Sequence, residues 1–275
     1  KQGTAGGECP NDAAVEGIID YAYDRGVFTL SELSVRGLSS TFCNSCFLGL
    51  ISAGGAGGDN SEERAYLEEH VLVSGPYTRL ARRAPSARTW SSHPNIASPL
   101  VVYQRDTTKQ FAARAIVDWY ASQGVTLRAE RVHFFGDRTE NIQAFRGFGY
   151  NAREVSCGSR DRSMGGMVGL CGATAAEIVS DTGVSTCAEM ETPAPTPALT
   201  PVPTPLPPAP PVPETTTAEP PDAPAVNCLC LFDIDRTLTG KQGSAGGACP
   251  SDRAVAGIAD HAYGGGVLTL SELSV

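Results

Sequence analysis

Residues 227–239 read Asn-Cys-Leu-Cys-Leu-Phe-Asp-Ile-Asp-Arg-Thr-Leu-Thr and carry the sharpest local signal in the chain. An apolar run ends at Asp233, and a second carboxylate, Asp235, follows two residues later. Short apolar runs of this length are typical of buried strands. Two carboxylates just past a buried strand can face one cavity, where one attacks phosphorus while the other moves a proton. Together they can also bind a hard cation through oxygen.

Outward from this stretch, short apolar runs alternate with helical patterns. The pattern predicts strands at 46–51, 100–103, 131–135, 152–157 and 227–234. It predicts helices at 12–25, 61–71, 107–123, 141–148 and 172–181. Such alternation indicates βαβ units and an α/β fold with a mainly parallel sheet. In sheets of this kind ligands bind at the carboxyl ends of the strands.

Polar residues collect where the predicted strands end. Ser52 follows the run Phe-Leu-Gly-Leu-Ile, and Asp137 follows Arg-Val-His-Phe-Phe-Gly. Lys109 stands near the start of a predicted helix, where the helix dipole disfavours a cation. A bound anion would compensate for that position, so these residues are candidates for one site.

The segment Asp233-Ile-Asp235-Arg-Thr237 resembles motif I, D-x-D-x-[TV], of the haloacid dehalogenase superfamily. Ser52 is similar to its motif II, Lys109 to motif III and Asp137 to motif IV. The fourth motif departs from the common form, because Asn141 stands at its second acidic position.

This resemblance implies a three-layer Rossmannoid sheet and a Mg²⁺-dependent phosphomonoester hydrolase. The implied catalytic residues are Asp233 as nucleophile, Asp235 as general acid and base, and Ser52 and Lys109 as phosphate ligands. The implied metal ligands are Asp233, Asp235, Asp137 and Asn141. A non-catalytic multivalent scaffold and a phosphotransferase or mutase remain as alternatives.

An internal repeat interrupts the family's order of motifs. Residues 1–35 and 241–275 match at 25 of 35 positions without a gap. We therefore interpret 1–190 as a domain that lacks its own first strand, and 227–275 as the start of a second copy. We expect 228–239 to fill the central gap in the sheet, and the 1–35 copy to win the packing site against strand 46–51. A neighbouring repeat is thus an expected partner.

The stretch between the two copies, 191–226, is a Pro/Thr-rich linker. Fourteen of the chain's 20 prolines lie between Thr192 and Ala225. Proline fixes φ and lacks an N–H, so a semi-extended polyproline II spacer is expected. The spacing of the motifs leaves no room for a large cap, since 57 residues separate Ser52 from Lys109. An open site of this kind suits a large phosphorylated substrate.

Charge and cysteine content narrow the remaining classes. The net charge of −9 argues against nucleic acid as a partner, and no run of 18 apolar residues predicts a membrane span. Nine cysteines include one C-x-x-C pair, Cys43 and Cys46. We expect buried reduced thiols there, with a disulfide or redox pair and a zinc site as alternatives. The compartment stays open.

Overall fold

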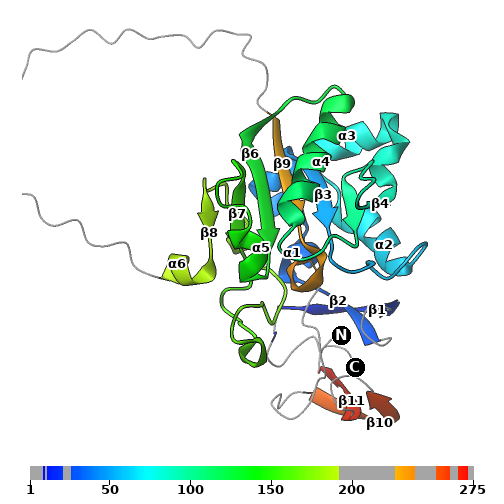
Figure 1. Cartoon of the computed structure of the whole chain (residues 1–275). Coiled ribbons are helices and arrows are strands. Elements are labelled where there is room, and N and C mark those ends of the chain that lie inside the picture. Colours follow the sequence, from blue (N-terminus) through cyan, green and yellow to red (C-terminus); the bar gives the residue numbers. More distant parts are fainter. Residues whose placement is uncertain are drawn as a thin grey trace, which may run out of the picture.

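The computed structural model describes Cys9, residues 11–20, 26–191 and 227–238, and the backbone alone of 252–260 and 266–271. Seven strands form one sheet in which all neighbours are parallel, in the order β4-β5-β3-β9-β6-β7-β8 (Figure 1). Their bounds are β3 (Phe47–Ile51), β4 (Trp90–Ser92), β5 (Leu100–Val102), β6 (Leu127–Gly136), β7 (Asn151–Glu154), β8 (Val184–Ser185) and β9 (Asn227–Phe232). The predicted α/β class with a parallel sheet is confirmed; the linker and Thr239 lie outside the described residues.

Strand β9 lies at the centre of this sheet, as predicted. Leu48 of β3 pairs with Cys230, and Phe134 of β6 pairs with Leu231. All side chains from Leu229 to Phe232 are buried, which explains the unbroken apolar run of a strand covered on both faces. Strand order reverses at β9, with β3 and β5 on one side and β6 and β7 on the other. That reversal places a crevice at the carboxyl end of β9.

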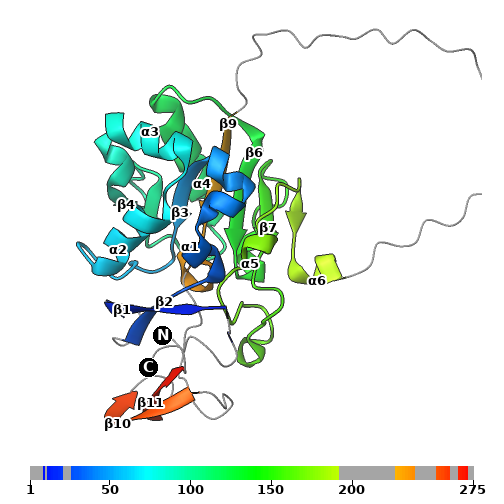
Figure 2. The same cartoon turned by 180° about the vertical axis from the view of Figure 1, so that it is seen from behind.

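Helices and turns cover both faces of the sheet. Helix α4 packs against β3 and β6 on one face, whereas the segment from α1 to η2 lies on the other (Figures 1 and 2). The helices are α1 (Glu32–Arg36), α2 (Glu62–Tyr66), α3 (Gly75–Arg83), α4 (Lys109–Ser122), α5 (Thr139–Gln143) and α6 (Cys187–Glu191). Shorter turns are η1 (Leu38–Ser40), η2 (Phe42–Ser45), η3 (Leu67–Val71), η4 (Pro85–Arg88), η5 (Arg162–Met164), η6 (Ala175–Glu177) and η7 (Ile234–Leu238). None of the helices in the described part of the chain is long and apolar enough to cross a membrane.

The helix predicted at 12–25 is wrong. Residues Ala13–Asp20 form β1, which pairs antiparallel with β2 (Gly26–Leu30). Gly17 has φ +82°, a left-handed conformation that breaks a helix, and the register shifts between Ala14 and Ile19. Pairing with a partner strand, which a local pattern cannot reveal, therefore overrides the helical spacing.

The helix predicted at 172–181 is also wrong. A capping box between Thr174 and Glu177 starts a turn, but η6 ends after one turn. Tertiary contacts take the backbone groups that a helix would need. The Gly172 N–H donates to Asp12, the Ala173 N–H donates to the Thr237 carbonyl (3.0 Å), and the Ala173 carbonyl accepts from Leu33 N–H (3.0 Å).

The expectation of reduced thiols at Cys43 and Cys46 is wrong. Both form disulfides, but with the strand β9 rather than with each other. The four bonds are Cys9–Cys171, Cys43–Cys230, Cys46–Cys228 and Cys157–Cys187. The C-x-x-C pair therefore fastens the segment before β3 to the central strand.

The first copy of the repeat holds the packing site, but against other partners than expected. Ser31 N–H and the Ser34 hydroxyl both donate to the Leu238 carbonyl, at 2.9 and 2.8 Å, and the Phe28 ring packs on Tyr66 of α2. These contacts go to η7 and α2, where contacts to strand 46–51 were expected. In the second copy β10 (Asp252–Asp260) pairs with β11 (Gly266–Ser271) in the register of the first hairpin, and both views place it beyond β1–β2 (Figures 1 and 2).

Candidate active site

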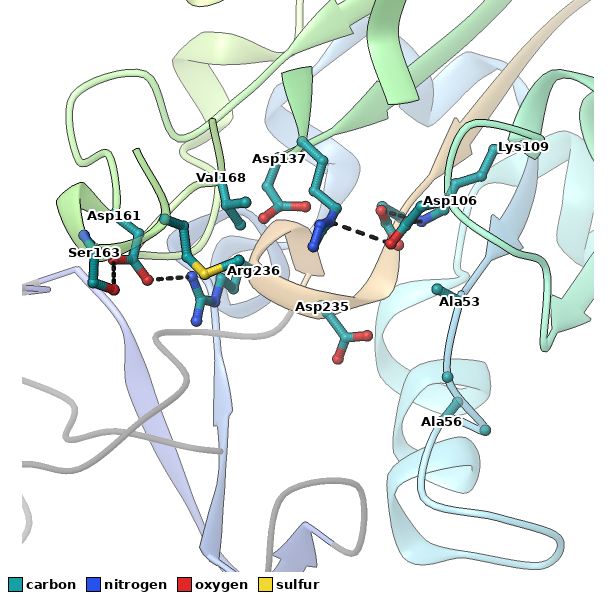
Figure 3. Close-up of a pocket in the computed structure, with 15 residues that line it drawn as sticks. Ala53, Ala56, Asp106, Lys109, Asp137, Asp161, Ser163, Val168, Asp235 and Arg236 are labelled. Carbon is teal, nitrogen blue, oxygen red and sulfur yellow. Dashed lines mark hydrogen bonds and ion pairs between the residues drawn. The ribbon is translucent and has the colours of Figure 1, made fainter. Parts of the chain in front are cut away.

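A cavity of about 540 Å³ opens at the carboxyl ends of β3, β9 and β6. Of the six predicted site residues, Asp233, Asp235, Lys109 and Asp137 line it (Figure 3). They reach it from β9 and its following turn, from the first turn of α4, and from the end of β6. Residues 124 positions apart in sequence thus share one site because β9 docks between β3 and β6.

Lys109 and Asp233 form a buried ion pair at the centre of the cavity. One carboxylate oxygen of Asp233 accepts from the Lys109 ammonium, and the other accepts from the Ile234 N–H at 2.9 Å. The two side chains are only 1% and 3% exposed. Burial raises the pKa of Asp233, and the Lys109 charge opposes that rise. The first turn of α4 carries this cation despite the helix dipole because a carboxylate compensates it.

The Asp137 carboxylate is buried beside this pair without a donor of its own. Among the residues that the structure describes, none donates a hydrogen bond to its side chain, although Asp137 is 2% exposed. Burial raises the pKa of Asp137, and the neighbouring charge of Asp233 raises it further. Two buried carboxylates facing one ammonium leave an excess of negative charge. Hard oxygen donors in that state suit Mg²⁺, so the residues present fit this cation.

Asp235 projects from η7 on the side away from Asp137 (Figure 3). The turn leaves helical geometry there, with ψ 128° at Asp235 and φ 52° at Arg236, and this aims the carboxylate at the loop after β3. A Cβ atom on Gly54 would lie 3.9 Å from Asp235 Oδ2 and 3.8 Å from Ser52 Oγ. Gly54 therefore separates the two predicted catalytic side chains by the width of a backbone.

Ser52 is buried at the end of β3 and lies behind the cavity lining formed by Ala53, Gly54 and Gly55. Its Oγ accepts from the Gly54 N–H at 3.1 Å. No acceptor for its hydroxyl proton is found among the described residues, so the O–H is left to donate.

Asn141 does not line the cavity. Its side chain is fully buried, with Oδ1 accepting from Thr107 N–H at 2.7 Å and Nδ2 donating to Asp106 Oδ1 at 2.9 Å. Thr107 has φ +64°, so the amide holds a strained loop immediately before α4. The structure places Asn141 as support for the Lys109 segment, apart from the carboxylates with which it was grouped as a metal ligand.

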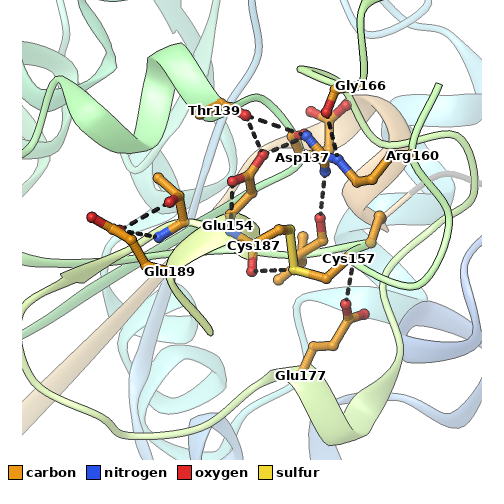
Figure 4. The surroundings of a disulfide bond; sticks show 12 residues. Asp137, Thr139, Glu154, Cys157, Arg160, Gly166, Glu177, Cys187 and Glu189 are labelled. Atoms are coloured by element: carbon orange, nitrogen blue, oxygen red, sulfur yellow. Dashed lines mark hydrogen bonds and ion pairs between the residues drawn. A yellow bond between two sulfur atoms is a disulfide. The ribbon is translucent and has the colours of Figure 1, made fainter. Parts of the chain in front are cut away.

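Residues 157–171 form the opposite wall, fastened at both ends by disulfides to Cys187 and Cys9 (Figure 4). Arg160 donates to the Asp137 carbonyl at 3.0 Å and forms an ion pair with buried Glu154. Further along, Asp161 pairs with Arg236 at 2.9 Å, and both line the cavity. The wall therefore ties the loop to the backbone of two candidate site segments.

Sequence reasoning missed four charged residues of the lining: Asp106, Arg138, Asp161 and Arg236. Arg236 lies inside the quoted motif, so its position next to Asp235 was a usable signal. Asp106 precedes Lys109 by three residues and lies 4.0 Å from its ammonium, another local signal. Asp161 and Arg138 come from loops whose sequence carries no comparable pattern.

A second cluster has metal-ligand spacing but not the chemistry. Cys9, Asp12 and Cys171 bring their ligand atoms within 4.8 Å of one another. Both sulfurs are consumed in the Cys9–Cys171 disulfide, and Asp12 accepts from the Gly172 N–H at 3.1 Å. A disulfide offers no thiolate for a metal, so this cluster is structural.

Comparison with known proteins adds no relative. No protein-family model matches the chain, and no match is found among curated proteins or solved structures.

Proposed function

We propose that this protein is a Mg²⁺-dependent phosphomonoester hydrolase of the haloacid dehalogenase type, acting through an aspartyl-phosphate on Asp233. The single observation that carries the proposal is the convergence of Asp233, Lys109 and Asp137 on one buried point beside Asp235. These side chains come from both sides of the switch point in strand order, where α/β proteins bind ligands.

In the first step an Asp233 carboxylate oxygen attacks phosphorus, and the bond between phosphorus and the ester oxygen breaks. The electron pair leaves with that oxygen, which takes a proton from Asp235. In the second step water attacks phosphorus and gives a proton to Asp235. The bond to Asp233 then breaks, and inorganic phosphate and the free carboxylate result.

Lys109 and Ser52 hold the phosphoryl oxygens in this scheme. An ammonium has three donors, so Lys109 can keep Asp233 and still reach a phosphoryl oxygen. The Ser52 hydroxyl accepts from Gly54 and has its proton left to donate. Asp233 and Asp137 would hold Mg²⁺, which when bound offsets the repulsion between the carboxylate and the phosphate dianion.

Phosphate release from p-nitrophenyl phosphate, with and without Mg²⁺, tests the proposal on the full chain. Asp233→Asn should lower kcat by at least about 10³-fold, because an amide is not a nucleophile here. The matched control is Asp118→Asn, the same change at an exposed position of α4, which should retain full activity. Circular dichroism and thermal unfolding of both variants establish that each is folded.

Three outcomes are informative. Activity retained in Asp233→Asn would remove the nucleophile assignment. A folded wild-type chain without Mg²⁺-dependent turnover of any phosphomonoester would favour the scaffold alternative. Transfer of the phosphoryl group to an added alcohol in preference to water would favour a phosphotransferase.

A further inference from the structure

A second cleft of about 600 Å³ lies beside the candidate active site, on the other side of the segment that leads into α4. Asp106 and Lys109 of this segment face the first cavity, while Arg105 and Thr108 face the second. The second cleft is also lined by His93, Tyr103, Gln104 and Phe111. It plays no part in the steps described so far.

Tyr103 stands where the two clefts meet. Its N–H donates to the Gly54 carbonyl at 3.0 Å, and a Cβ atom on Gly55 would lie only 2.7 Å from its hydroxyl oxygen. The Tyr103 side chain therefore lies directly over Gly55, next to the glycine that adjoins Asp235. A group leaving from the oxygen that Asp235 protonates would pass along Gly54 and Gly55 onto this ring.

The backbone of this segment is strained in a way that presents the ring. Tyr103 has φ +57° and Thr107 has φ +64°, and neither is glycine. A left-handed residue with a bulky side chain costs about 1–2 kcal/mol, and such strain persists where the surrounding structure enforces it. Here the Gly54 carbonyl enforces the first position and Asn141 the second. As a result Tyr103 is 60% exposed rather than packed into the core.

Aromatic surface and positive charge lie together in the cleft. Phe111 of α4 is 57% exposed on the same side as Tyr103. Arg105 is exposed and forms no ion pair with any residue that the structure describes, and His93 is exposed nearby. On the floor, the Gln104 amide nitrogen donates to Thr108 Oγ1 at 2.6 Å, while Gln104 Oε1 has no donor within the described ranges.

The geometry points to this cleft as the subsite for the leaving group, and to an aromatic phosphomonoester with a further negative charge as the substrate class. The ring of such a substrate stacks on Tyr103 and Phe111, and its anionic substituent faces Arg105. This inference rests on the proposed function for the reaction itself, but its recognition step can be measured by binding alone.

The test uses phosphonates, in which a methylene replaces the ester oxygen and prevents hydrolysis. Benzylphosphonate, 4-carboxybenzylphosphonate and ethylphosphonate are titrated into the full chain with Mg²⁺ by calorimetry. Benzylphosphonate should bind about tenfold more tightly than ethylphosphonate, from ring stacking. The carboxylate should add about threefold more, the size expected for an exposed ion pair.

Variants separate the two contacts. Tyr103→Asn removes the ring but keeps a residue that tolerates left-handed backbone, and should abolish the preference for the benzyl compound. Tyr103→Phe should restore it. Arg105→Gln should remove only the gain from the carboxylate, while Arg79→Gln, an exposed arginine on α3, is the matched control and should change nothing.

Equal affinity for benzylphosphonate and ethylphosphonate, or a preference that survives Tyr103→Asn, would overturn the inference. Failure of the proposed function has a different signature, because the binding preferences would be present without Mg²⁺-dependent turnover of the corresponding esters.

Discussion

Lys109 balances the charge of the candidate site at the scale of single residues. It faces two buried carboxylates, Asp233 and Asp137, whose pKa values burial raises. A buried cation that loses its partner, or a buried anion that loses its cation, is strongly unfavourable. The sequence signal for Lys109 was its unfavourable place at a helix start, and the ion pair with Asp233 is the physical reason that the place is tolerated.

Lys109→Met should therefore destabilise the fold as well as the reaction. We expect the free energy of unfolding without metal to fall by about 3–5 kcal/mol, the cost of breaking a buried pair. Mg²⁺ should recover part of this loss, because a ligand that binds only the folded state stabilises it. Urea unfolding with and without Mg²⁺ measures both effects.

Arg146→Met is the control for that measurement, since it breaks an exposed ion pair with Glu189 at 2.5 Å. Its cost should be about 0–1 kcal/mol and independent of Mg²⁺. A Lys109→Met variant no less stable than Arg146→Met would contradict the assignment of a buried, charge-balancing lysine.

At the scale of elements, strands were easier to predict than the segments between them. The runs at 46–51, 100–103 and 227–234 became β3, β5 and β9 because central parallel strands are apolar on both faces. Residues 13–20 became a strand against their helical spacing, since Gly17 needs a positive φ and β2 supplies the pairing. Information of that kind lies in the partner strand and not in the segment itself.

His133 gives β6 a measurable acid sensitivity. The side chain is 4% exposed and its ring packs edge-on against Phe42. Burial lowers the pKa of His133 to about 4, and nearby Arg131 lowers it too, while Asp181 opposes both. Between that value and the ordinary value near 6.5, the unfolded chain binds the proton and the folded chain does not. Stability then rises with pH in this window and is lost as the pH falls.

The slope attributable to His133 should reach about 1.4 kcal/mol per pH unit. His133→Phe should flatten the pH dependence of the unfolding free energy between pH 4 and 6.5. The same substitution at exposed His70 should leave that dependence as in the wild type. Parallel profiles for the wild type and His133→Phe would show that this histidine is not buried neutral.

For the whole molecule, the docking of β9 was predictable and its covalent attachment was not. The repeat and the missing central strand required a segment such as 228–239 to enter the sheet. Eight cysteines allow 105 pairings, however, and spacing in sequence does not choose among them. Cys43 and Cys46 pair with Cys230 and Cys228 because strand docking brings them together, a fact that exists only in the folded chain. Buried disulfides persist in oxidising compartments, so we expect the protein to fold in one.

The two bonds to β9 should be redundant with each other but costly to lose together. They span 187 and 182 residues and are nested, so either one closes nearly the same loop. Closing a loop of that length lowers the entropy of the unfolded chain by the equivalent of about 5 kcal/mol, whereas the second bond closes only a few further residues, worth about 2 kcal/mol. Replacing Cys43 and Cys230 with alanine should thus cost about 2 kcal/mol, and replacing all four cysteines should cost more than three times as much. Denaturant unfolding under non-reducing conditions measures these costs. If removing either bond alone cost as much as removing both, β9 would not be held by two independent staples, and the central position of the nucleophile strand would depend on a single disulfide.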